Sequence, residues 1–150
     1  MTDFSEDLLQ YDRRPEPLPQ ISADDWVEIE NLAGSALPSE FKDFCAQVRE
    51  YYFEGNIPSF HGKGTDGDDW LTVLHREREQ CENPIPASLI PFCGVGNGDY
   101  HCFRIRDAQR CAYDVVYWYA EEAAAYQIKN LHVLAPDFAT WLQGYVHDEY

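Results

Sequence analysis

The sequence predicts one α+β domain, in which N-terminal and C-terminal helices pack on a twisted, mostly antiparallel sheet. Three observations predict it: helical periodicity near the N-terminus, β-type segments between residues 89 and 119, and a second helical stripe after Pro136. Helices followed by a meander of strands and a closing helix are typical of α+β domains. The 150 residues suit one domain, and 45% of them are apolar, enough for a core. We assign this domain to residues 22–150 and an N-terminal arm to residues 1–21.

The arm contains prolines at every second position, which favours an extended backbone and prevents a continuous helix. These prolines are Pro15, Pro17 and Pro19. Three apolar residues before them could form a short amphipathic turn, namely Phe4, Leu8 and Leu9. Two interpretations stay open: the turn docks on the domain, or the N-terminus is loose.

Two helices should follow the arm and pack against each other. The first begins at the N-cap Ser22, with Asp24 and Asp25 in its first turn, and ends at Gly34. Its apolar face comprises Trp26, Ile29 and Ala33. The second follows Leu37-Pro38-Ser39, and its apolar residues have helical spacing: Phe41, Phe44, Cys45 and Val48. Only a short loop joins the two helices.

The middle of the chain changes character. Residues 51–53 suit a strand or a buried helix end, and residues 57–61 could be a short strand. A loop rich in Gly and Asp follows at residues 61–69. Asp68 or Asp69 could cap a third helix, ended by Pro84 and Pro86, whose shared face would comprise Trp70, Val73, Leu74 and Cys81.

From residue 89 the pattern indicates strands. Residues 89–93 and 100–105 flank the turn GVGNGD, where Asn97-Gly98 predicts a hairpin. Gly98 should supply the positive φ that the turn needs, and the Asp99 side chain should accept hydrogen bonds from nearby backbone N–H groups. We therefore interpret Gly98 and Asp99 as structural residues of the turn.

The rest of the sheet and a closing helix complete the prediction. VVYWY at residues 115–119 indicates a central strand, residues 121–129 a turn or short helix, and residues 131–134 a last strand. Pro136 should open a helix with the apolar stripe Phe138, Trp141, Leu142 and Tyr145. We expect Trp26, Trp118 and Trp141 in the core, whereas Trp70 follows an acidic loop and could be exposed.

The charge and the cysteines exclude several classes of protein. With 27 Asp and Glu against 11 Lys and Arg, the net charge of −16 opposes nucleic-acid backbones and anionic lipid. The sequence shows no secretory signal and no apolar run of membrane-spanning length, so we expect a cytoplasmic protein. The five cysteines should then be reduced and mostly buried: Cys45, Cys81, Cys93, Cys102 and Cys111. Nothing indicates an oligomeric state.

No pattern for catalysis, a metal or a cofactor emerges. The glycine turn matches neither dinucleotide nor P-loop spacing. Cys93, Cys102, Cys111 and His101 lack zinc-site spacing, and His101 and Cys102 should point to opposite faces of one strand. We therefore expect no enzyme, no metal site and no cofactor. A Cys/His enzyme or metal protein is the less favoured alternative.

The acidity favours a basic protein partner. Aromatic residues beside carboxylates make good interface anchors, and two segments combine them: Asp66, Asp68, Asp69 and Trp70 on the Gly-rich loop, and Glu121, Glu122 and Tyr126 after the apolar strand. Each segment taken alone could equally be a solvated loop. The acidic first helix, with Asp24, Asp25 and Glu28, is the fallback location.

The order of several landmarks resembles the SUKH superfamily. These landmarks are WVEIE at 26–30, LPSEFKDF at 37–44, LIPFCGVGNGDYHCFRI at 89–105, VVYWY at 115–119 and PDFATWLQGY at 136–145. The Pro-rich arm and residues 51–83 depart from the pattern. The resemblance covers about residues 22–146 and implies an α+β fold that works by binding, without catalytic residues.

Bacterial members of that superfamily are largely immunity proteins, and it also includes eukaryotic regulatory scaffolds. The resemblance and the acidity together favour an immunity protein that binds and neutralises a cognate basic toxin, such as a nuclease. The alternative is a regulatory interaction module without a toxin partner. The sequence does not identify the toxin or the face that binds it.

Overall fold

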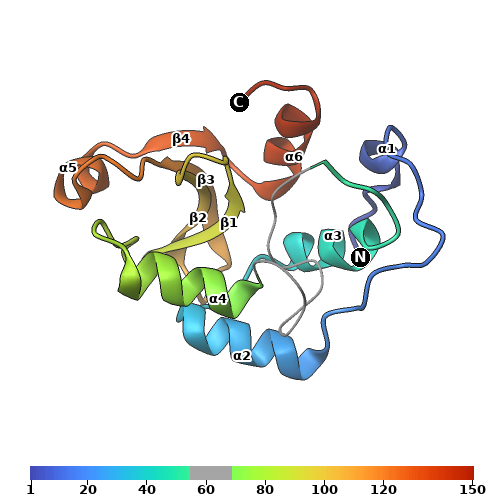
Figure 1. Cartoon of the computed structure of the whole chain (residues 1–150), viewed down its shortest axis with the longest axis horizontal. Coiled ribbons are helices and arrows are strands. Elements are labelled where there is room, and N and C mark those ends of the chain that lie inside the picture. Colours follow the sequence, from blue (N-terminus) through green and yellow to red (C-terminus); the bar gives the residue numbers. More distant parts are fainter. Residues whose placement is uncertain (55–68) are drawn as a thin grey trace.

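A computed structural model describes residues 1–54 and 69–150, and it has the α+β architecture that the sequence predicts (Figure 1). The predicted strand at 57–61, Asp66 and Asp68 lie outside the described residues. The helical elements are α1 (Ser5–Leu8), α2 (Ala23–Ala33), α3 (Ser39–Val48), α4 (Trp70–His75), the π-helical turn η1 (Arg76–Gln80), α5 (Ala124–Lys129) and α6 (Phe138–Val146). The strands are β1 (Leu89–Gly94), β2 (Tyr100–Asp107), β3 (Ala112–Trp118) and β4 (His132–Ala135).

The four strands form one antiparallel sheet in the order β1-β2-β3-β4. Because side chains alternate along a strand, the sheet separates two apolar clusters. On β2, Phe103 belongs to the larger cluster with α3 and α6, whereas Cys102 belongs to the smaller one with Trp118. VVYWY therefore contributes to an inner strand, as predicted.

Phe41 on α3 is at the centre of the larger cluster. Its ring makes edge-on contacts with Trp70, Phe92, Phe103 and Phe138 at centroid distances of 5.1–5.8 Å. These partners come from α4, β1, β2 and α6. One buried phenylalanine thus joins helices from both ends of the chain to the sheet.

The N-terminal arm docks on the domain. Phe4 and Leu8 are fully buried, and the Phe4 ring packs edge-on against Phe44 at 5.5 Å. Further along, the backbone N–H of Arg14 donates to the Glu50 carbonyl and that of Leu18 to the Arg49 carbonyl. The docked turn is therefore the correct one of the two interpretations.

The predicted boundaries of α2 are confirmed, and α3 begins at Ser39, the last residue of the segment that we expected to precede it. Ser22 forms a capping box with Asp25, and Gly34 ends α2 with φ of 83°. One core assignment is wrong: Trp26 is only half-buried, and the Lys42 ammonium lies 5.4 Å from its ring centroid. The Lys42 ammonium therefore lies over a ring that we expected inside the core.

The third helix is capped by Asp69, which accepts a hydrogen bond from the Thr72 N–H at 2.8 Å. Trp70 is completely buried, so the expectation that it could be exposed is wrong. The predicted shared face of Trp70 and Cys81 does not form. The π-helical turn η1 follows α4 with more residues per turn, and Cys81 itself has an extended backbone.

The side chain of Arg78 anchors the π-helical turn η1. Its guanidinium donates to the carbonyls of Leu32 and Ala33 at the end of α2, both at 3.0 Å. It also donates to the carbonyls of Ala87 and Leu89 at the start of β1. One cation therefore satisfies carbonyl groups at a helix end and beside the sheet.

The last elements follow the prediction with two small shifts. Residues 121–129 contain the helix α5, and β4 lies one residue later than the predicted strand 131–134. The closing helix begins at Phe138 rather than at Pro136, since Asp137 is the N-cap and accepts from the Thr140 N–H. No helix in the described part of the chain could cross a membrane.

Candidate functional site

Among the described residues, those of the first predicted acidic segment are not exposed at the surface. Asp69 is 8% exposed and caps α4, and Trp70 is 0% exposed. Their side chains are structural, which corrects their assignment to a partner-binding surface. The rings of Trp70 and Phe41 meet in the core, a contact that the polar sequence before Trp70 conceals.

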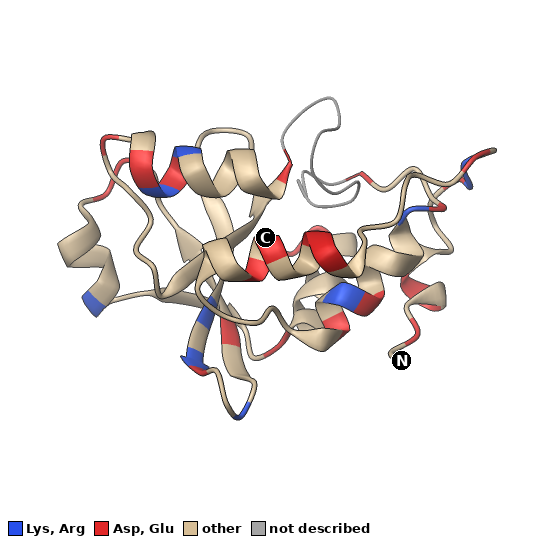
Figure 2. Ribbon diagram, turned by 90° about the horizontal axis from the view of Figure 1, so that it is seen from below, with Lys and Arg blue, Asp and Glu red and all other residues tan. Residues whose placement is uncertain are grey.

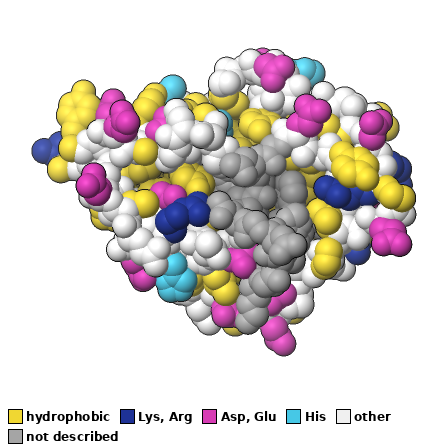
Figure 3. Space-filling model, in the orientation of Figure 1, with side chains coloured by type: hydrophobic (Ala, Val, Ile, Leu, Met, Phe, Trp, Pro, Cys, Tyr) yellow, Lys and Arg dark blue, Asp and Glu magenta, His cyan; other side chains and the backbone are white. Residues whose placement is uncertain are grey.

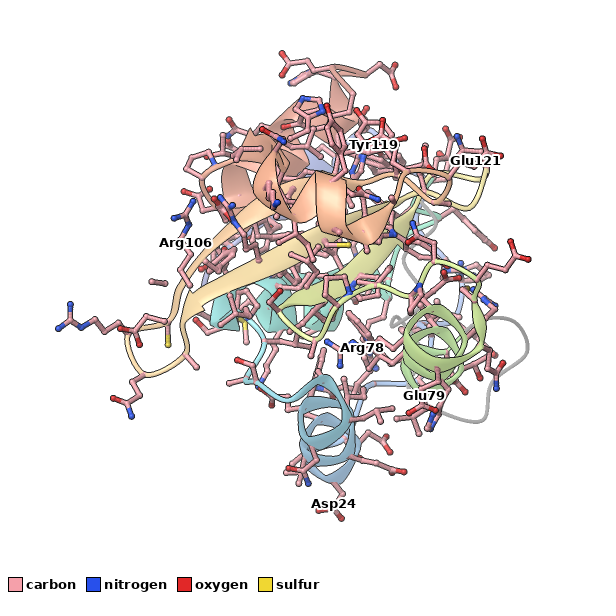
Figure 4. The ribbon with its side chains drawn as sticks, turned by 90° about the vertical axis from the view of Figure 1, so that its left-hand side faces the viewer. Asp24, Arg78, Glu79, Arg106, Tyr119 and Glu121 are labelled. Atoms are coloured by element: carbon pink, nitrogen blue, oxygen red, sulfur yellow. The ribbon has the colours of Figure 1, made fainter. Side chains whose placement is uncertain are left out.

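The second segment is on the surface. Glu121 and Glu122 are exposed in the loop between β3 and α5, and Tyr126 on α5 is 64% exposed. In Figure 4 the Glu121 side chain points outward at the edge of the molecule. The space-filling view shows acidic side chains scattered over the visible face and basic ones in few places (Figure 3).

The loop that carries Glu121 and Glu122 is held from beneath by Gln127. Gln127 is 2% exposed, and its side-chain oxygen accepts from the Tyr119 N–H at 3.0 Å. Its amide nitrogen donates to the carbonyls of Tyr119 and Glu122 at 2.6 and 2.8 Å. A buried glutamine on α5 therefore fixes both ends of a short acidic loop.

Two more side chains complete the support of this loop. Asn83 donates to the carbonyls of Ala120 and Glu122 and accepts from the Ala124 N–H. From the glycine turn, Asp99 accepts from the Ala120 N–H and from the Tyr117 hydroxyl, both at 2.8 Å. The loop is thus preorganised by residues from three separate parts of the chain.

Asp99 and Gly98 act as structural residues in this arrangement. Gly98 has φ of 95°, in the left-handed region that glycine adopts without strain. The hydrogen bond from Tyr117 to Asp99 adds to burial, and together they raise the pKa of Tyr117 to about 12. The turn therefore connects the β1–β2 hairpin to the acidic loop after β3.

Beside the loop is an open groove of about 650 Å³. Its lining comprises four glutamates and five other residues: Glu77, Glu82, Glu121, Glu122, Cys81, Asn83, Trp118, Ala120 and Ala123. No lysine or arginine is among these described lining residues. The groove therefore presents negative charge over a floor that includes the buried Trp118.

Glu77 and Glu82 were missed by sequence reasoning. They lie about forty positions before Glu121 and are brought beside it by η1 and the segment that follows. Their only sequence signal is acidity on a polar helical stretch, which is ordinary for a solvated face. The groove is a product of tertiary structure.

The thiol in the groove is held in its protonated form. Cys81 Sγ donates to Glu77 Oε2 at 3.3 Å, and burial together with that carboxylate raises the pKa of Cys81. Glu77 also pairs with Arg76, whose Nε lies 3.0 Å from Glu77 Oε1. Because the thiolate is the nucleophilic form of cysteine, this environment disfavours nucleophilic chemistry.

The fallback location on α2 is elsewhere on the surface. Asp24 and Glu28 are exposed, whereas Asp25 belongs to the capping box. Figure 2 shows the acidic residues of α2 along the helix, and Figure 4 shows Asp24 at the opposite end of the view from Glu121. The two acidic surfaces can therefore be tested separately.

The metal and catalytic alternatives gain no support from the described residues. Among them, no group of three or more His, Cys, Asp and Glu is placed to hold a metal ion. His101 and Cys102 face opposite sides of β2, with His101 against Trp141 and Cys102 in the smaller cluster. The preorganised acidic groove is suited to binding a cationic surface.

Comparison with protein families gives a match over most of the chain. The family model of the SMI1 / KNR4 family (SUKH-1) matches residues 20–144, which include α2 through most of α6. The comparison with curated proteins gives no match.

Proposed function

The chain belongs to the SMI1 / KNR4 family (SUKH-1), and from this membership we propose that it is an immunity protein. It binds a cognate basic toxin in the cytoplasm and neutralises the toxin through protein–protein contact. The observation that carries the proposal is the acidic groove, in which four glutamates surround a volume of about 650 Å³.

The charge distribution supports a basic partner. A net charge of −16 attracts cationic proteins from a distance and increases the rate of encounter. Because Glu77 already pairs with Arg76, it is Glu82, Glu121 and Glu122 that then provide local acceptors for lysine and arginine side chains. A nuclease toxin would offer such side chains, because an enzyme that binds a phosphate backbone needs positive charge.

The rigid loop supports high affinity. Since Gln127, Asn83 and Asp99 already fix the backbone around Glu121, binding does not have to order it. Tyr126 and Ile128 are exposed on α5 next to this loop and supply apolar contact area. In this proposal the protein inhibits the toxin by covering the surface with which the toxin contacts its own substrate. Such inhibition needs no catalytic step by this protein.

The first experiment is co-expression with the product of the neighbouring gene. If that product is a toxin, cells that express it should survive only when this protein is present. Purified toxin then allows measurement of association rates against ionic strength for two matched double variants, Glu121→Lys with Glu122→Lys and Asp24→Lys with Glu28→Lys.

The two variants change the net charge equally and differ in location. We expect reversal at the groove to slow association about tenfold at low salt and to flatten its salt dependence. The α2 variant should show a smaller effect that reflects total charge alone. A larger effect of the α2 variant than of the groove variant would place the interface on α2. Survival of toxin-expressing cells without this protein would contradict the immunity function.

A further inference from the structure

A second pocket, which shares no residue with the acidic groove, has a different chemical character. Its volume is about 200 Å³, and its walls come from the residues just after α1, residue 54, the last turn of α6 and the residues after it. The side chains that matter are Gln10, Tyr11, Glu54, Tyr145, Asp148 and Tyr150. Three phenols and two carboxylates therefore meet in one concavity.

The aromatic walls are held in place by the core. The Tyr145 ring stacks on Trp141 at a centroid distance of 4.8 Å and also stacks on Phe53 at 5.9 Å. Tyr11 contacts the same Phe53 edge-on at 5.0 Å. The phenols of Tyr11 and Tyr145 are thus positioned by packing.

The third wall is made by a tight return of the chain after α6. The Asp148 N–H donates to the Tyr145 carbonyl, and the Glu149 N–H donates to the Gly144 carbonyl. Tyr150 then lies against α6 at Gly144, where an added Cβ would be 2.5 Å from the Tyr150 hydroxyl. The absence of a side chain at Gly144 therefore creates the space that Tyr150 occupies.

The electrostatics of the pocket are negative. Burial, with the charges of Glu54 and Asp148, raises the pKa of Tyr11. Burial is also the main cause of a raised pKa at Tyr145; Cys93 adds to it, and the Asp148 charge makes the smallest contribution. The described residues that line the pocket include no lysine or arginine to balance these charges.

Hydrogen-bond acceptors dominate such a site. Two carboxylates, phenol oxygens and the Gln10 amide can accept several hydrogen bonds from one group, and aromatic rings favour a cation nearby. A guanidinium provides five donors and a delocalised positive charge on a flat frame. An ammonium provides three donors and retains its hydration more strongly.

We propose that this pocket binds the guanidinium of an arginine side chain from a protein partner, with Glu54 and Asp148 as its counter-ions. The inference does not depend on the proposed immunity function, because any arginine-bearing partner would satisfy it. The pocket and the acidic groove are then two distinct cation sites on one acidic protein.

The test is an NMR titration of the full chain with N-acetyl-arginine amide, free arginine and N-acetyl-citrulline amide. Citrulline is the neutral isostere of arginine, and free arginine separates a small-molecule site from one that prefers a peptide-like ligand. The variants are Glu54→Gln, Asp148→Asn and Gly144→Ala. Glu149→Gln is the matched control, because it removes the same charge next to the pocket without lining it.

We expect N-acetyl-arginine amide to shift the resonances of Tyr11, Tyr145 and Tyr150, and citrulline amide to have little effect. Glu54→Gln and Asp148→Asn should each weaken binding about tenfold, as expected for loss of a charged hydrogen-bond partner. Gly144→Ala should weaken binding with no change of charge, because Tyr150 must move.

Three results would overturn the proposal. The first is no shift in these tyrosines, and the second is equal binding of citrulline amide. The third is equal weakening by Glu149→Gln, which would indicate attraction to net charge rather than to a site. Tighter binding of free arginine than of the amide would reject the protein partner and retain the guanidinium site. Unchanged thermal midpoints show that the variants are folded.

Discussion

Mild acid should destabilise this protein through His101. His101 on β2 is 3% exposed, and its Nδ1 accepts a hydrogen bond from Trp141 Nε1–H at 2.9 Å. That bond leaves the ring proton on Nε2 and requires a neutral imidazole, because the protonated ring has no acceptor. His101 also packs against the rings of Tyr117 and Tyr150.

The magnitude follows from the difference between folded and unfolded chains. Burial, with a smaller effect of His132, lowers the pKa of His101 from 6.5 to about 4. The folded protein therefore binds this proton less readily than the unfolded chain. The contribution of neutral His101 to stability is complete above pH 6.5 and is lost as the pH falls toward 4. The full loss is about 3 kcal/mol, of which about 2 kcal/mol is gone by about pH 5.

Urea unfolding at pH 7.5 and pH 5 measures this loss, and His101→Gln isolates it. The glutamine oxygen can still accept from Trp141 at either pH, and the carboxylates titrate alike in both proteins. We expect the wild type to lose about 2 kcal/mol more than His101→Gln between these pH values. If both proteins lost the same free energy, His101 would not be the titrating group and the reasoning from burial would be refuted.

Three further predictions concern the frame. Gly98→Val should lower the free energy of unfolding by about 1–3 kcal/mol, because φ of 95° strains a β-branched residue; an unchanged melting midpoint would contradict this. Arg78→Met should lower it by about 1–3 kcal/mol, since part-buried carbonyls of α2 and β1 lose their donor. Calorimetry against Arg76→Met, which leaves those carbonyls paired, provides the comparison. Iodide should quench only the fluorescence of Trp26, because Trp26 is half-buried and the other three tryptophans are buried. Trp26→Phe should therefore abolish the quenching. Quenching that persists in this variant would mean that Trp70, Trp118 or Trp141 is accessible.

Local signals allowed much of the fold to be predicted. The cap at Ser22, the stop at Gly34 and the glycine turn depend on neighbouring residues, so the sequence contains what determines them. The burial of Trp70 depends on Phe41, almost thirty positions earlier, and no local pattern reports it. Cys81 was placed on the wrong face because the wide turn η1, anchored by Arg78, breaks the helical period.

The candidate site likewise combines residues that a local sequence pattern identifies with residues that only the fold brings together. Glu121, Glu122 and Tyr126 were identified from their own segment, because acidic and aromatic residues outside a predicted core are visible in sequence. Glu77 and Glu82 join them only when the chain folds. The roles of Asn83 and Gln127 were also hidden, since a polar residue that will satisfy distant backbone groups is indistinguishable from a solvated one.

The support of the acidic loop has an evolutionary consequence. Gln127, Asn83 and Asp99 hold the backbone of residues 119–124, and none of these hydrogen bonds uses the side chain of Glu121 or Glu122. Substitutions at these two positions should therefore alter which surface is recognised while stability changes little. A lineage that meets new partners could diversify its specificity here one residue at a time, without passing through unfolded intermediates.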